Sequence, residues 1–136
     1  MPIRVLLDTS ILLTSLKLRL DILGETEELL QAKVEFLVPK QVQNELRRLS
    51  AKPKLVGVRA ARALEITAKC KIIDLTPAPS ADDAFIRASK EIKGVVATTD
   101  SQLKRKLRAI HVPVLSLRGN RLYCEPETPQ YWPSML

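Results

Sequence analysis

The segment Ile3-Arg4-Val5-Leu6-Leu7-Asp8-Thr9-Ser10 joins a short apolar run to an acid and two hydroxyl residues. Four of the five residues at positions 3–7 are apolar, which is typical of a strand buried on both faces of a parallel sheet. The functional crevice of an open α/β sheet lies at the carboxyl ends of its strands, so Asp8 stands where chemistry would occur. Asp8 could equally be only the N-cap of a following helix, and this segment alone leaves both explanations open.

Strand and helix patterns alternate along the rest of the chain. Further strands are expected at residues 34–38, 71–75, 95–98 and 113–117, with a short edge strand at 121–124. Helices are expected at residues 10–20, 25–33 (after a break near Gly24), 40–51, 55–69, 80–93 and 101–109. This alternation predicts α/β architecture with a mainly parallel sheet, and right-handed crossovers would place the ends of its strands at one edge.

Length and composition predict one domain spanning residues 1–136, with an irregular, Pro-rich tail at about 125–136. The chain is 46% hydrophobic and 27% charged, as in an ordinary soluble globular protein. No apolar run is long enough to span a bilayer, and no basic-then-apolar leader precedes Asp8. Cys70 and Cys124 lack a metal-ligand spacing, which leaves a buried pair or two free thiols and makes a cytoplasmic location the default.

The chain carries 22 basic and 15 acidic residues, for a net charge of +7. A polyanion such as nucleic acid is therefore the expected partner, although a well-solvated basic surface would explain the same balance. Aromatic residues make up only 4% of the chain, which argues against a base-stacking platform for single strands.

Several acids fall near the same expected edge of the sheet. Asp100 follows the strand at 95–98 as Asp8 follows the first, and Asp82 and Asp83 begin a helix that follows a strand and a turn. Glu45 flanks the apolar stripe of the helix after the second strand. Because helix N-termini and strand C-termini lie at one edge, these carboxylates are expected to converge in one crevice.

Each acid also has a simpler explanation. The acids that begin helices suit capping and the helix dipole, and Glu45 could pair with Arg47 or Arg48. Clustered carboxylates, however, repel one another unless a cation relieves the repulsion. Hard oxygen ligands select Mg²⁺ or Mn²⁺, and one or two such ions in a basic protein indicate metal-assisted hydrolysis of phosphodiesters.

At these positions the sequence resembles the PIN (PilT N-terminus) nuclease domain over nearly the whole chain. The resemblance rests on Asp8-Thr9-Ser10, Glu45, Ala81-Asp82-Asp83 with Ile86, and Ala97-Thr98-Thr99-Asp100. The last two motifs, continued to Leu103-Lys104-Arg105, are most similar to the rRNA-processing branch, the archaeal relatives of the small-subunit processome nuclease. The resemblance implies a three-layer α/β/α fold with strand order 3-2-1-4-5 and a metal-dependent endoribonuclease.

The resemblance also implies the site. Its catalytic and metal-binding acids would be Asp8, Glu45, Asp83 and Asp100, with Ser10 and Thr98 as supporting hydroxyls. Family spacing favours Asp83 as the metal ligand, and Asp83 is the predicted ligand. The apolar stripe of the helix instead favours Asp82 facing inward. Ser10 replaces a common Asn and Gln102 replaces a frequent Asp, so the number of metal ions stays open.

Three functions follow as hypotheses: an endoribonuclease acting on rRNA precursors, a VapC-type toxin held by an antitoxin protein, or a catalytically weak RNA-binding scaffold. A homodimer is possible under each. At 100° per residue, Lys104, Arg105 and Arg108 share a face of the helix at 101–109 and are expected to flank the crevice and bind RNA phosphates, while Lys106 points elsewhere. The alternatives are a solvated charged helix and an RNA path across Arg47, Arg48, Lys52 and Lys54.

Overall fold

Six strands form one sheet in the order β3-β2-β1-β4-β5-β6 in the computed structural model, which describes residues 2–127, 129 and 132. The strands are β1 (Ile3–Leu7), β2 (Val34–Pro39), β3 (Lys71–Ile73), β4 (Val95–Ala97), β5 (Val114–Arg118) and β6 (Arg121–Glu125). All neighbours pair in parallel except β5 and β6, which are antiparallel. The 3-2-1-4-5 order and the added edge strand are therefore confirmed.

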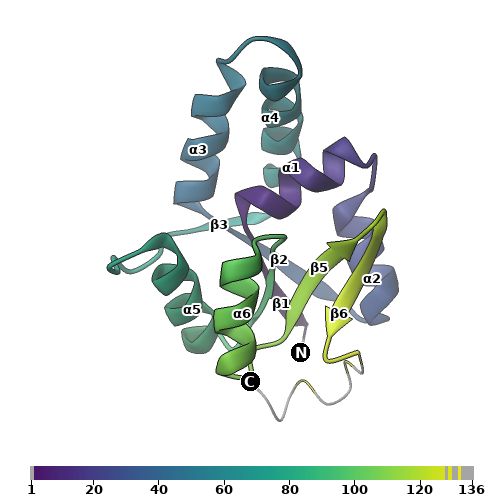
Figure 1. Ribbon diagram of the computed structural model, residues 1–136, viewed down its shortest axis with the longest axis vertical. Helices are drawn as coiled ribbons and strands as arrows, with labels where there is room; N and C mark the ends of the chain where they lie inside the picture. The colour runs from purple at the N-terminus through teal and green to yellow at the C-terminus, as the bar shows by residue number, and fades with distance from the viewer. Residues whose placement is uncertain (1, 128, 130–131, 133–136) are drawn as a thin grey trace.

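The helices pack around this sheet (Figure 1). They are α1 (Thr9–Lys17), α2 (Ile22–Leu30), α3 (Lys40–Ser50), α4 (Lys54–Thr67), α5 (Ala81–Glu91) and α6 (Ser101–Ala109). Helices α5 and α6 contact each other and pack on β4 and β5, whereas α3 and α4 pair as a hairpin that extends away from the sheet at the top of Figure 1. Across the described residues, no helix is long and apolar enough to cross a bilayer.

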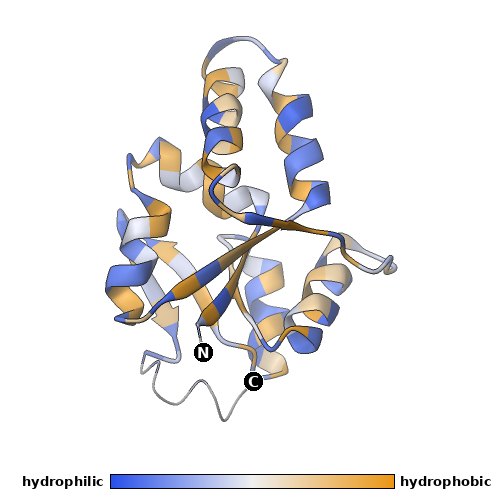
Figure 2. Cartoon of the chain, turned by 180° about the vertical axis from the view of Figure 1, so that it is seen from behind, coloured by the Kyte–Doolittle hydropathy of each residue, from blue (hydrophilic) through white to orange (hydrophobic). Residues whose placement is uncertain are grey.

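The core lies in and against the central strands. Val5, Leu6 and Leu7 of β1 are fully buried, as expected for a strand flanked by neighbours on both sides. Figure 2 shows the hydrophobic colour concentrated in the strands, whereas the helices carry mixed hydrophilic and hydrophobic faces. Burial of this apolar surface is the main favourable term that holds β1, and therefore Asp8, in place.

The break between the first two helices lies earlier than the predicted position near Gly24. Helix α1 ends at Lys17, and Arg19 then adopts a positive φ of 58°. Asp21 is the N-cap of α2, and its carboxylate accepts a hydrogen bond of 3.2 Å from the Gly24 amide. Gly24 therefore lies inside the first turn of α2, and the capping acid was the signal that marked the boundary.

The end of the chain is only partly described. Strand β6 includes Glu125, so the predicted tail begins later than residue 125. Trp132 is buried and donates from Nε1 to the Pro126 carbonyl oxygen at 3.2 Å, while most of the remaining tail lies outside the described residues. Cys70 and Cys124 are both free thiols, and burial raises the pKa of Cys70 to about 11.

Candidate active site

The ends of β1 and β4 bring two polar residues together. The two strands pair in parallel with Leu7 opposite Ala97, and the Asp8 amide donates to the Ala97 carbonyl oxygen at 3.2 Å. Asp8 and Thr98 therefore leave the sheet side by side at its carboxyl edge. Asp8 is only 8% exposed and Thr98 is fully buried, so this pair forms the floor of the site.

Both oxygens of the Asp8 carboxylate accept hydrogen bonds. Oδ1 accepts from the Ser10 hydroxyl at 2.7 Å and from the Ile11 amide at 2.9 Å. Oδ2 accepts a short hydrogen bond from the Thr98 hydroxyl. Asp8 is thus the N-cap of α1 and also a cleft residue, so the two explanations left open by the sequence both apply.

The two hydroxyl groups are held in a fixed orientation. The Thr99 amide donates to Ser10 Oγ at 3.0 Å, and the Asp100 amide donates to Thr98 Oγ1 at 3.0 Å. Because each oxygen accepts from a backbone amide, each hydroxyl hydrogen is free to point toward Asp8. Ser10 and Thr98 therefore support the carboxylate, in the positions that the resemblance implied.

Burial is the main influence on the pKa of Asp8, raising it from 3.8 to about 6. Hydrogen bonds from Thr98, Ile11 and Ser10 lower this pKa in part, and the nearby Asp100 carboxylate raises it further. Near neutral pH Asp8 is consequently a buried anion that a bound cation would stabilise.

This pKa predicts how stability depends on pH. The folded protein holds the Asp8 proton up to a pH of about 6, whereas the unfolded chain loses it near pH 3.8. The stabilisation is complete below the lower value and is lost as pH rises through the upper one. Relative to Asp8→Asn, the wild type should therefore lose on the order of 2 kcal/mol of unfolding free energy between about pH 4 and about pH 7. Urea unfolding of both proteins in EDTA measures this, and a difference that stays constant with pH would contradict it.

A cleft with a volume of about 260 Å³ opens above Asp8. Its acidic lining residues come from the loops and helices around the carboxyl edge of the sheet: Asp8, Glu45, Asp82 and Asp100. Val42, Phe85 and Leu103 supply apolar walls. The cleft therefore combines carboxylate oxygens with apolar walls.

Glu45 lies on α3 with its side chain exposed to solvent at the cleft. Within the described part of the chain no ion pair joins Glu45 to Arg47 or Arg48, and Arg47 instead donates to the side chain of Asn44 at 3.3 Å. The structure therefore does not show the ion pair that would explain Glu45 as a surface residue, and it does place Glu45 on the cleft.

Helix α5 presents Asp82 to the cleft, and Asp83 is not among the lining residues. The Asp83 amide donates to the hydroxyl of Ser80, the N-cap of this helix, at 3.1 Å. Phe85 lies one turn beyond Asp82 and is buried against the core. The structure thus puts on the cleft the acid that the apolar stripe indicated, and not the one that family spacing indicated.

Asp100 combines the same two roles as Asp8. Its Oδ1 accepts hydrogen bonds from the amides of Gln102 and Leu103 at 2.8 and 3.1 Å, which caps α6. Its side chain also lines the cleft, whereas Gln102 is exposed and does not. The residue that replaces a frequent family Asp therefore lies outside the acidic cleft.

The donor set fits a hard divalent cation, although the carboxylates are spread out. Within residues 2–127, 129 and 132, no three acidic, histidine or cysteine side chains lie close enough to form a ready metal site. Repulsion between carboxylates separates them when no cation is bound. Four carboxylates around one cleft, with Asp8 buried beneath them, are still the oxygen ligands that Mg²⁺ and Mn²⁺ prefer.

The predicted basic face of α6 turns toward β6. Lys104 is half-buried, and its Nζ donates to the Tyr123 hydroxyl at 3.4 Å. Arg108 binds both carboxylate oxygens of Glu125, at 2.5 and 2.9 Å, and this pairing raises the pKa of Arg108 and lowers that of Glu125. Two residues of this face, Lys104 and Arg108, thus have partners on β6, and none of the three predicted RNA-binding residues is among those that line the cleft.

Lys106, which helical geometry predicted to point away from the crevice, is the α6 base that contacts a cleft acid. Lys106 Nζ lies 3.3 Å from Asp82 Oδ2. Arg105 is exposed and forms no ion pair within the described residues. The spacing of Leu103 and Leu107 predicted the buried face of α6. It could not show which of the two neighbouring faces of the helix would contact α5.

Comparisons with known proteins identify the family and the fold of this chain. A family model described as "PIN like domain" matches residues 5–120. Ribonuclease VapC4 of Methanocaldococcus jannaschii is 31% identical over 124 residues, which is 88% of this chain and 94% of that protein. The solved structure of the PIN domain endonuclease Utp24 matches with a TM-score of 0.76 and 27% identity, over 91% of this chain and 92% of the other. A domain of a functionally unknown M. jannaschii protein, with a TM-score of 0.57 and 16% identity over 85% of this chain and 91% of the other, shares the fold alone.

Proposed function

Because this chain belongs to the PIN-like domain family, we propose that it is a divalent-metal-dependent endoribonuclease whose active site is the acidic cleft. The observation that supports this proposal most strongly is the gathering of Asp8, Glu45, Asp82 and Asp100 around one cleft at the carboxyl edge of the sheet. Likeness to Ribonuclease VapC4 supports RNA as the substrate.

The same four acids would hold the metal, as one ion or two. When bound, a divalent cation activates water and neutralises charge on the phosphodiester. Asp8 is held for this role by the hydroxyls of Ser10 and Thr98, which donate to its Oδ1 and Oδ2, respectively. The buried side chains of Phe85 and Leu103 form apolar walls beside these carboxylates.

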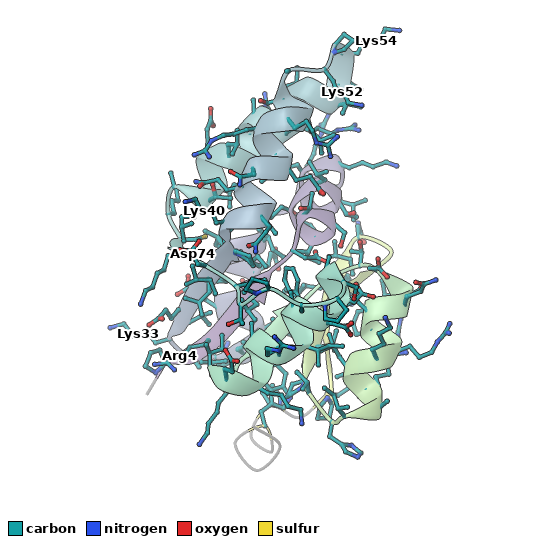
Figure 3. The ribbon with its side chains drawn as sticks, turned by 90° about the vertical axis from the view of Figure 1, so that its left-hand side faces the viewer. Arg4, Lys33, Lys40, Lys52, Lys54 and Asp74 are labelled. Carbon is teal, nitrogen blue, oxygen red and sulfur yellow. The ribbon has the colours of Figure 1, made fainter. Side chains whose placement is uncertain are left out.

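The RNA path is proposed to follow the α3–α4 hairpin. Arg47, Arg48, Lys52 and Lys54 are all exposed, and none of them forms an ion pair within the described residues. Figure 3 shows Lys52 and Lys54 pointing outward at the far end of the hairpin. Since Glu45 lies on α3, a phosphate backbone leaving the cleft would meet these cations next.

Two biological substrates are compatible with this activity. We propose rRNA precursors, on the strength of the motifs shared with the rRNA-processing branch, with which the likeness to the endonuclease Utp24 is consistent. The likeness to Ribonuclease VapC4 favours a second candidate, a toxin ribonuclease bound by an antitoxin. A scaffold that had lost catalysis would have no need to keep four carboxylates clustered where RNA phosphate would bind.

One experiment separates these functions. Purified protein is incubated with labelled pre-rRNA fragments and with unrelated structured RNAs, in Mg²⁺, Mn²⁺ or EDTA. Metal-dependent cuts at discrete positions in pre-rRNA alone support rRNA processing. Cleavage of other RNAs, together with a small antitoxin gene beside this one, supports the toxin. Binding without any cleavage would support the scaffold and overturn the proposed activity.

A pair of variants tests which α5 acid belongs to the site. Asp82→Asn should lower the rate of RNA cleavage by about 100-fold, the upper part of the range for groups that hold or orient a catalytic metal. Asp83→Asn, a matched change at the next position, should lower it less than about 5-fold, because Asp83 does not line the cleft. Single-turnover cleavage in Mn²⁺ measures both. A larger loss of cleavage rate for Asp83→Asn than for Asp82→Asn would identify Asp83 as the metal ligand.

A further inference from the structure

Lys106 connects the basic helix α6 to the acidic cleft. Its Nζ lies 3.3 Å from Oδ2 of Asp82, with the Lys106 side chain 49% exposed and the Asp82 side chain 24% exposed. Asp82 itself lines the cleft. The pair therefore spans from α6 to α5 at the rim of the site, with the lysine on the solvent side.

The cleft lacks a positive charge of its own. No lysine or arginine is among its lining residues within the described part of the chain. Of the other cations of α6, Lys104 contacts Tyr123 and Arg108 is bound to Glu125, whereas Arg105 is exposed and, within the described residues, neither lines the cleft nor pairs with one of its acids. Lys106 is consequently the α6 base placed to meet an anion that enters the cleft.

We propose that Lys106 is the phosphate-binding residue of the cleft, and that it stays paired with Asp82 until a divalent cation binds that carboxylate. The proposal rests on the proposed function. In the free protein the ammonium group neutralises Asp82. With a divalent cation held by Asp82, the Lys106 ammonium group would be released from that carboxylate and would bind a non-bridging oxygen of an RNA phosphate beside the cleavage position.

Exchanging the Lys106–Asp82 ion pair for a cation on Asp82 costs little free energy. A partly exposed ion pair contributes little stability, because water screens it and because holding two side chains costs entropy. A doubly charged cation attracts the same carboxylate more strongly than an ammonium group does, and it repels Lys106. An ammonium on a flexible stem can then reach a phosphate without movement of the helix.

The first test measures metal affinity without any RNA. Lys106→Gln should bind Mn²⁺ about 3- to 10-fold more tightly than wild type, because the competing charge is gone. The readout is the rise in melting temperature as Mn²⁺ is titrated. Arg105→Gln is the matched control, since it removes one positive charge from the same helix at a position without an ion pair, and it should leave Mn²⁺ affinity nearly unchanged.

The second test measures RNA affinity in EDTA, so that no cleavage occurs. A short fluorescein-labelled RNA is the probe, and the proteins are wild type, Asp82→Asn, Lys106→Gln and the double variant. Asp82→Asn frees Lys106 and should tighten binding by about 5-fold, whereas the same change in the Lys106→Gln background should give less than about 2-fold. In the Asp82→Asn background, where Lys106 is free, Lys106→Gln should also make the dependence of log affinity on log salt shallower by roughly 0.7, one phosphate contact to single-stranded RNA.

The outcomes separate this proposal from the proposed function. Tighter Mn²⁺ binding by Lys106→Gln, together with a gain from Asp82→Asn that depends on Lys106, supports it. Equal Mn²⁺ affinity in Lys106→Gln and Arg105→Gln, or equal gains from Asp82→Asn in both backgrounds, overturns it and makes the pair an ordinary surface ion pair. Wild-type protein that binds neither Mn²⁺ nor RNA would instead overturn the proposed nuclease function.

Discussion

Asp8→Asn is expected to lower RNA cleavage by at least about 1,000-fold, equivalent to about 4 kcal/mol of transition-state stabilisation. The reason is its position: both oxygens of Asp8 are held in the floor of the cleft by hydrogen bonds from Ser10 and Thr98. Asn keeps the shape but loses the charge and one of the two acceptor oxygens. The measurement is single-turnover cleavage of a labelled RNA in Mg²⁺ and in Mn²⁺.

The control for Asp8→Asn is its melting temperature in EDTA. Because burial raises the pKa of Asp8, the charged carboxylate costs stability near neutral pH, and the neutral variant should melt at the same temperature as wild type or higher. A stable variant without activity assigns the loss to chemistry. Wild-type activity in Asp8→Asn would remove the nuclease assignment from this cleft.

Glu45→Gln is expected to lower cleavage by about 10- to 100-fold, the loss typical of removing a group that holds or orients a metal. It should also reduce the rise in melting temperature that Mn²⁺ produces, because a cation that binds only the folded state stabilises it by mass action. Glu45 is exposed at the cleft and has no ion-pair partner within the described residues. The change should therefore leave the metal-free melting temperature nearly unaltered.

Glu65→Gln provides the matched control for Glu45. Glu65 is an exposed glutamate on α4, and it does not line the cleft. The two variants change the net charge equally, so any difference in Mn²⁺ response reports on position and not on charge alone. If both variants give the wild-type cleavage rate and the same Mn²⁺ shift, Glu45 is only a surface acid.

Much of the fold and part of the site followed from local patterns. The strand at residues 3–7 and the helix at 101–109 were predicted at their observed bounds, because burial and capping produce characteristic patterns in adjacent residues. Ser10 and Thr98 were implied as supporting hydroxyls by the family resemblance, whereas Asp8 and Asp100 were predicted at the site for a related reason. Each stands within a few residues of a strand end, and parallel strands share one edge.

The side chains that meet across elements were not predictable in the same way. The apolar stripe of α6 identified Leu103 and Leu107 as buried, but it left open which basic flank would face the cleft. The antiparallel β6 brings Glu125 to Arg108, and the packing of α5 against α6 brings Asp82 to Lys106. Helical periodicity gives the angle of a residue around its own axis, and only the packing of two axes decides what that residue meets.

The choice between Asp82 and Asp83 shows the same division. Both acids suit the first turn of a helix, where backbone amides and the dipole favour negative charge, so local energetics do not separate them. Burial of Phe85 against the core sets the rotation of α5, and that rotation presents Asp82 to the cleft. The local sequence thus determines the strands, the helix caps and the central carboxylate, Asp8. Long-range packing determines that Asp82 lines the cleft and that Lys106 pairs with it, because those contacts join residues far apart along the chain.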